Sequence, residues 1–176
     1  MPGAFDRFEV AVRAILGQQI SVKAASTLMA RLVEAFGEPI QTPISGLTRL
    51  TPTPEKIVQC PPEALTALGI LASRSQTIRA IAQAVISENL QLHNYADIRP
   101  TVIALRKIPG VGDWTAQYIA MRVLADPDAF PAGDLVLRRS LGVDKASQAL
   151  RIAEAWRPWR AYAAIYLWKS LAERAK

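Results

Sequence analysis

Cysteine and histidine are nearly absent from this 176-residue chain, which contains one of each. One cysteine cannot form an internal disulfide, and one cysteine with one histidine cannot complete a structural zinc site. We therefore expect a reducing compartment, no zinc, and an inert structural thiol at Cys60. A chain of this length can bury a sufficient core without such staples.

Long hydrophobic runs are also missing. No apolar run approaches the ~20 residues that a membrane span requires, and the amino terminus lacks the charged-then-apolar layout of a secretion signal. We therefore expect a soluble, cytoplasmic protein with no membrane partner.

Acidic residues are outnumbered: 15 Asp and Glu stand against 21 Lys and Arg, which gives a net charge of +6. The hydrophobic fraction of 51% and the charged fraction of 20% indicate an ordered globular protein. The basic excess favours a polyanionic partner such as nucleic acid, although charge alone does not decide this, since many basic proteins bind no nucleic acid.

Strand-like alternation is missing as well, and apolar residues instead recur at helical spacing, as at Phe5, Phe8, Val12 and Ile15. The pattern predicts an all-α protein whose single region, residues 1–176, surrounds a central hairpin. Residues 38–54, rich in proline, predict a loop, and Pro158 is expected in the first turn of the last helix. The expected helices span about 4–16, 22–36, 54–59, 62–68, 73–88, 97–107, 113–125, 134–141, 145–156 and 158–173.

A compact turn, Ile108-Pro109-Gly110-Val111-Gly112, joins two of these helices. Glycine permits unusual backbone angles and carries no side chain that would keep a phosphate away, and the N–H groups at the next helix start point outward unpaired. Such a hairpin would hold a DNA backbone without reading sequence. A lone Gly-x-Gly favours an ordinary turn, but the surrounding Pro109 and Thr115-Ala116 make the pattern more specific.

The full pattern resembles the helix-hairpin-helix of the DNA glycosylase superfamily that includes endonuclease III. The resemblance implies two helical lobes that flank an active-site cleft, with the hairpin at about 105–125, in a protein that binds damaged double-stranded DNA as a monomer. It implies no cofactor and no side-chain metal site, but a Na+ or K+ ion at the backbone carbonyls of the turn. The DNA backbone contacts that it implies come from Ile108, Gly110, Val111, Gly112 and Thr115.

Asp134 follows a Pro-Ala-Gly loop and opens an apolar helix, which by itself favours a helix N-cap. The essential Asp of the superfamily sits at the corresponding helix start, so the resemblance implies that Asp134 is catalytic. Breaking an N-glycosidic bond develops positive charge on the sugar, and a nearby carboxylate stabilises that charge and orients or deprotonates the attacking water. One carboxylate can serve both as cap and as catalyst.

Superfamily members that also cut the strand carry a lysine two residues after the second hairpin glycine, where its amine forms a Schiff base with the sugar. Trp114 occupies that position here. We therefore expect a monofunctional, hydrolytic reaction, with Lys107 facing phosphate rather than sugar.

Four segments narrow the resemblance: residues 13–21, the hairpin with Trp114, the Gly133-Asp134 corner and residues 156–162. In order and spacing they are similar to DNA-3-methyladenine glycosylase II, the AlkA type, over nearly the whole chain. This implies excision of alkylated purines such as 3-methyladenine and 7-methylguanine in base excision repair. It assigns Trp114, Trp168 and Tyr118 to a base pocket, where electron-rich rings would favour a cationic base by ~0.5–2 kcal/mol.

Further aromatic residues lie nearby in the sequence. Tyr162 and Tyr166 share one helix face, and with Trp156 and Trp159 they are hypothesised to stack on an extruded base, although each alone is typical of a core residue.

The chain departs from the enterobacterial member of the AlkA type at three points. Gln19 replaces the apolar wedge that fills the space left by a flipped nucleotide, and a wedge role for Gln19 stands beside its reading as a polar residue at a helix end. Gly133 stands where that member has a carboxylate. The sequence begins inside the helical region, so we expect no amino-terminal α/β domain like that of the larger relatives, and either a short enzyme or an incomplete copy.

Two alternatives stay open. The chain could be a non-catalytic or truncated DNA-binding module that kept the hairpin, or a glycosylase for uracil, oxidised or mismatched bases. Adenine-mismatch and endonuclease III relatives normally carry a four-cysteine iron–sulfur cluster, which a single cysteine excludes.

Overall fold

The computed structural model describes residues 3–93 and 96–174, and the regular structure in these ranges is helical. An isolated bridge between Pro39 and Arg49 is the only strand-like pairing in them. The all-α class predicted from the sequence is confirmed. The helices are α1 (Arg7–Leu16), α2 (Val22–Phe36), α3 (Pro54–Gln59), α4 (Pro62–Ala67), α5 (Ala72–Ile86), α6 (Ile98–Lys107), α7 (Asp113–Arg122), α8 (Leu135–Ser140), α9 (Ala146–Ala153), the 3₁₀ turn η1 (Glu154–Trp156) and α10 (Arg160–Arg174).

Several helices begin where a short polar side chain accepts a hydrogen bond from a backbone N–H of the first turn. This satisfies one of the donors that a helix start leaves unpaired, and it fixes where the helix begins. The residues that cap in this way are Asp6, Ser21, Thr53, Asp97 and Asp134.

Some predicted helix bounds are wrong by a few residues. α1 begins at Arg7 rather than at residue 4, because Asp6 accepts the N–H of Glu9 at 3.0 Å and caps the helix there. α7 ends at Arg122 rather than at residue 125, because Ala125 adopts a φ of 57° outside the helical region.

The prediction for Pro158 is also wrong. The segment 145–156 leaves α-helical geometry after Ala153 and continues as η1, and the N–H of Trp159 then donates to the carbonyl of Trp156 at 2.8 Å. Pro158 lies inside this turn, so α10 begins two residues later, at Arg160.

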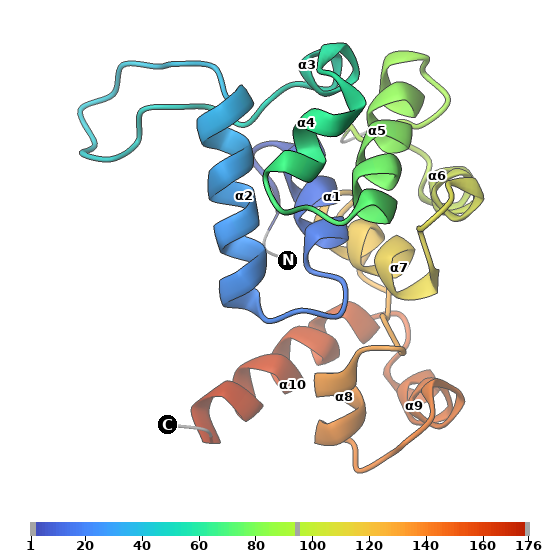
Figure 1. The fold of residues 1–176 in the computed structure, drawn as a ribbon. Helices are drawn as coiled ribbons and strands as arrows, with labels where there is room; N and C mark the ends of the chain where they lie inside the picture. Colours follow the sequence, from blue (N-terminus) through green and yellow to red (C-terminus); the bar gives the residue numbers. More distant parts are fainter. Residues whose placement is uncertain (1–2, 94–95, 175–176) are drawn as a thin grey trace.

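Two apolar cores share one helix, α7. The first core is built mainly from α1 to α6 and takes Ala116 and Ile119 from α7. The second lies among α8, α9, α10 and residues 129–132 and takes Ala120 and Met121 from α7. Figure 1 shows the same division, with α8, α9 and α10 grouped on the far side of α7 from α2 to α5. The two helical lobes predicted from the resemblance correspond to these two cores.

Asp128 fixes the start of α10 against the loop that follows α7. Its carboxylate accepts hydrogen bonds from Nε and Nη2 of Arg160 at 2.7 and 2.9 Å and also pairs with Arg157. Beside this ion pair, the N–H of Ala161 donates to the carbonyl of Pro127 at 2.9 Å. These contacts set the position of α10, which carries Trp168.

Within the described residues, no helix is both long and apolar enough to cross a membrane.

Candidate functional site

Asp134 lies at the point where α7, α8 and α10 meet, and its carboxylate accepts three hydrogen bonds. Oδ1 accepts the N–H of Leu137 at 2.9 Å and the indole N–H of Trp168 at 3.0 Å. Oδ2 accepts the indole N–H of Trp114 at 3.0 Å. The side chain is half-buried. Asp134 is therefore an N-cap, as the sequence predicts, and it is also held by two indoles from other helices.

The three hydrogen bonds do not use all the acceptor sites of this carboxylate. An ionised carboxylate has about four lone-pair sites, two on each oxygen. Both sites on Oδ1 are used, whereas Oδ2 receives one donor. Oδ2 can therefore accept a further hydrogen bond from a water molecule, or lie against a developing positive charge, without losing its protein contacts.

The aromatic rings predicted for the base pocket gather around this carboxylate. Trp114 and Tyr118 stand one turn apart on α7, with ring centroids 5.4 Å apart and planes inclined by 19°, so that they stack. Tyr118 and Trp168 lie 6.2 Å apart in a tilted arrangement. Tyr118 thus connects the two rings whose N–H groups hold Asp134.

The hairpin turn is built around Gly110, which has a φ of 86°. The hydroxyl of Thr77 on α5 lies 2.9 Å from the carbonyl oxygen of Pro109, and a Cβ added to Gly110 would meet that hydroxyl oxygen at 2.0 Å. Thr77 is buried, so it cannot readily move aside. Glycine is therefore required at position 110 both by the backbone angle and by the close approach of α5.

The hairpin residues that are predicted to contact DNA differ in how exposed they are. Gly112 is exposed and caps α7 without a side-chain hydrogen bond, whereas Val111 and Thr115 are buried. Ile108 is half-buried and packs against the first core. The N–H groups of Ile108 and Val111 already donate to the carbonyls of Leu105 and Ile108. A phosphate would therefore be met by the backbone N–H groups of Gly110 and of the start of α7 rather than by side chains.

Charged residues flank the turn. Arg106 at the end of α6 pairs with Asp113 at the start of α7, and both side chains are about half exposed. Lys107 is exposed beside them. The pairing with Arg106 offsets the negative charge of Asp113 at this helix start.

Gln19, the predicted wedge, is exposed and has a φ of 55°. A positive φ is uncommon for a residue other than glycine. Sequence reasoning missed its neighbour Gln18, whose side-chain amide donates to the carbonyl of Gly110 and to Oγ1 of Thr115, each at 3.0 Å. No local pattern could have found this residue, because its partners lie more than 90 positions away in the sequence.

Four other aromatic residues do not join the site. Trp156 packs edge-on against Phe130 in the second core, with centroids 6.1 Å apart. Trp159 and Tyr162 contact one another edge-to-face at 5.8 Å, and both are exposed, as is Tyr166. No ring contact or hydrogen bond joins any of them to Asp134 in the described part of the chain. The hypothesis that they help to stack an extruded base has no support from this arrangement.

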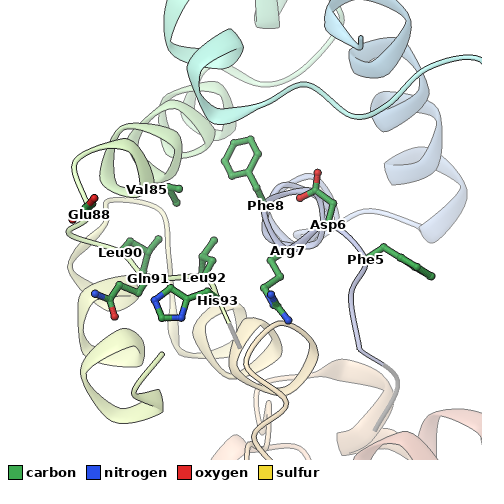
Figure 2. A pocket seen from close by; sticks show the side chains of 10 residues that line it. All are labelled: Phe5, Asp6, Arg7, Phe8, Val85, Glu88, Leu90, Gln91, Leu92 and His93. Carbon is green, nitrogen blue, oxygen red and sulfur yellow. The ribbon is translucent and has the colours of Figure 1, made fainter. Parts of the chain in front are cut away.

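A separate groove of about 740 Å³ lies on another part of the molecule. Its side chains come from residues 5–8 on one side and from the end of α5 and the loop after it, residues 85–93, on the other (Figure 2). None of the predicted site residues lines it. Within residues 3–93 and 96–174, no group of three or more His, Cys, Asp and Glu side chains could hold a metal ion.

Comparison with known proteins identifies the family. Residues 12–160 match the family model of the HhH-GPD superfamily base excision DNA repair proteins. The chain is 42% identical over 175 residues to the probable bifunctional transcriptional activator/DNA repair enzyme AlkA of Mycobacterium tuberculosis. It is 34% identical over 168 residues to DNA-3-methyladenine glycosylase 2 of Escherichia coli.

These two alignments cover 97% and 96% of this chain but only 35% and 59% of the relatives, so the chain spans between about a third and three fifths of their length. Among solved structures, the 3-methyladenine DNA glycosylase of Schizosaccharomyces pombe in complex with abasic DNA superposes with a TM-score of 0.76 at 27% identity. That match covers 96% of this chain and 82% of the other. The resemblance read from the sequence and the helix-hairpin-helix fold are confirmed.

Replacing Gly110 with alanine is expected to lower the free energy of unfolding by about 2–4 kcal/mol, because the positive φ costs about 1 kcal/mol and overpacking against Thr77 adds about 1–3 kcal/mol. Urea unfolding followed by circular dichroism measures the loss. Gly46→Ala is the matched control, since Gly46 has a φ of 83° but open space around the added Cβ. Equal losses in the two variants would show that the contact with Thr77 has no effect.

Proposed function

The chain belongs to the HhH-GPD superfamily of base excision DNA repair proteins, and from this premise we propose that it is a monofunctional DNA glycosylase that excises alkylated purines by hydrolysis of the N-glycosidic bond. The observation that carries the proposal is the carboxylate of Asp134, fixed between the indoles of Trp114 and Trp168. The names of its relatives support the lesion class, since both the Escherichia coli and the Schizosaccharomyces pombe proteins are called 3-methyladenine glycosylases.

The proposed reaction begins with a nucleotide turned out of the double helix, because an enzyme cannot reach the glycosidic bond of a stacked base. As the bond to the base breaks, positive charge develops on the sugar. Asp134 stabilises that charge through Oδ2, which keeps a free lone pair, and can take a proton from the attacking water. The indole donors keep the carboxylate in place, so little reorganisation is needed when the charge forms.

The rings around Asp134 suit a cationic base. Alkylation at N3 or N7 of a purine leaves a positive charge and weakens the glycosidic bond. Trp114, Tyr118 and Trp168 offer electron-rich faces, which attract a cation by about 0.5–2 kcal/mol. Tyr118 covers one face of Trp114 in the stacked pair, so a base would stack on the opposite face of that indole or on Trp168.

Hydrolysis, rather than strand cleavage through a Schiff base, follows from the residue at position 114. The indole nitrogen of Trp114 is not a nucleophile, and it already donates its proton to Asp134. Lys107 is exposed at the end of α6 on the other side of the turn, where its charge suits a phosphate.

The hairpin is proposed to hold double-stranded DNA through backbone N–H groups at the start of α7. We propose that the same turn holds a monovalent cation. The carbonyl oxygens of Ile108, Pro109 and Gly110 each accept one hydrogen bond within the protein and keep a second lone pair, and neutral oxygens of this kind suit Na+ or K+. Such an ion would add positive charge beside a phosphate. A cytoplasmic location and a monomeric state stay predictions.

Asp134→Asn is expected to abolish release of 3-methyladenine from methylated duplex DNA while it leaves binding to that DNA within about twofold. Asparagine is as good an N-cap as aspartate, so α8 should be preserved, but its NH2 group cannot accept the indole N–H of Trp114 and some stability should be lost there. Chromatography of the released bases and anisotropy of a labelled duplex measure the two effects.

The same assay separates the alternatives. Binding without base release by the parent protein would support a non-catalytic DNA-binding module. Release of uracil, or of an oxidised or mismatched base, in place of alkylated purines would support another substrate. A cut strand in the absence of alkali would contradict the monofunctional reaction.

Trp168→Phe is expected to slow base release at least about tenfold, because it keeps an aromatic ring but removes the N–H that holds Oδ1 of Asp134. Single-turnover kinetics measure the rate. Trp156→Phe makes the same chemical change at a ring that packs against Phe130 in the second core and, within the described residues, shares no hydrogen bond with the carboxylate, and it should leave the rate unchanged. Similar losses in both variants would point to general damage to the lobe.

The affinity for undamaged duplex DNA is expected to fall steeply with salt, with a slope of about −0.9 in log K against log salt for each phosphate contacted. Anisotropy titrations between low and moderate salt measure this slope. A binding constant that does not change over this range would contradict contact through the phosphate backbone.

A further inference from the structure

The five residues between α1 and α2, residues 17–21, are fastened to the rest of the protein through Gln18. The side-chain nitrogen Nε2 donates to the carbonyl of Gly110 in the hairpin turn and to Oγ1 of Thr115 in the first turn of α7, each at 3.0 Å. The backbone carbonyl of Gln18 also accepts a hydrogen bond from Nη2 of Arg74 on α5. Both N–H groups of the Gln18 side-chain amide are thus used, and both acceptors belong to the hairpin.

Gln19, the next residue, is presented to solvent by this anchoring. Its side chain is exposed, and its φ of 55° lies in the left-handed region, which costs a residue other than glycine roughly 1–2 kcal/mol. α2 begins soon afterwards at Val22, capped by Ser21. The strained residue is therefore held between an anchored residue before it and a capped helix after it.

We propose that Gln18 is a positioning residue for base extrusion: it sets the place of Gln19 relative to the DNA-holding hairpin, so that Gln19 enters the base stack where a nucleotide has left it. The inference rests on the proposed glycosylase function. Gln18 touches neither the reacting sugar nor the base in this proposal, and it acts through Gln19.

Gln19 can act as a wedge only if it is placed correctly relative to the hairpin. The hairpin is proposed to hold the phosphate backbone of the duplex, whereas a wedge acts on the base stack. The two must act at the same nucleotide step. A side chain on a connecting segment loses this alignment if the segment shifts by about 1 Å. Gln18 removes that freedom, because its two side-chain hydrogen bonds end on the hairpin itself.

Gln18→Leu tests the proposal, since leucine is similar in size but cannot donate. We expect release of 3-methyladenine from duplex DNA to slow about tenfold or more, the effect of losing two hydrogen bonds of ordinary strength. Release from a single-stranded oligonucleotide, which has no paired stack to open, should stay within about twofold of the parent. Gln41→Leu, the same change at an exposed loop residue, is the matched control and should alter neither rate.

A double variant distinguishes a role of Gln18 in positioning Gln19 from a general role in stabilising the fold. If Gln18 acts through Gln19, then Gln18→Leu combined with Gln19→Ala should be no slower on duplex DNA than Gln19→Ala alone. Additive losses, equal losses on duplex and single-stranded DNA, or an unchanged duplex rate in Gln18→Leu would overturn the proposal.

A binding measurement keeps this test independent of catalysis. In a duplex with 2-aminopurine beside an abasic-site analogue, insertion of a wedge unstacks the probe and raises its fluorescence. The parent protein should produce this rise, and Gln18→Leu should lose most of it while anisotropy shows unchanged binding. A parent protein that releases no base would contradict the proposed function alone, since the fluorescence comparison still decides the role of Gln18. An equal fluorescence rise in both proteins would overturn that role.

Discussion

The carboxylate of Asp134 and its three N–H donors are the contact on which the rest of the site depends. One donor belongs to its own helix, α8, and the other two are indoles from α7 and α10. Asp134 is therefore fixed only when three helices have reached their final positions. The ion pair of Asp128 with Arg160 secures α10, and the two cores on either side secure α7. Much of the packing of the second lobe can be understood as the support of one side chain.

The sequence was most informative about local structure. Apolar spacing and capping residues such as Ser21 and Asp97 placed the helices close to their observed bounds, because these signals act within one turn. Errors arose where a helix began later than expected, as at Asp6 and Pro158, or where a backbone angle ended a helix early, as at Ala125. The N–H of Asp126 bonds to the carbonyl of Ala120 after Ala125 has turned away, and no residue pattern marked that point in advance.

The site was predicted only in part, and mainly from the family resemblance rather than from local sequence patterns. Composition and spacing alone favoured an N-cap at Asp134, and only the family resemblance pointed to catalysis. The indole hydrogen bonds of Trp114 and Trp168 could not be predicted, because they depend on how helices 20 and 34 positions away pack. Gln18 was missed for the same reason, because its partners are distant in the sequence. Tyr162 and Tyr166 share a helix face and were expected to stack on an extruded base, but both are exposed.

The place of α7 in both cores has a mechanical consequence. A single ten-residue helix carries buried side chains for each lobe, so the lobes cannot separate without exposing apolar side chains of that helix. A protein built in this way has little freedom to fold itself around a lesion. In the proposed reaction the distortion must then fall on the nucleic acid, whose bending and unstacking energies depend on how well each base is held by its neighbours. Weakly stacked nucleotides would be the ones that such a rigid frame selects.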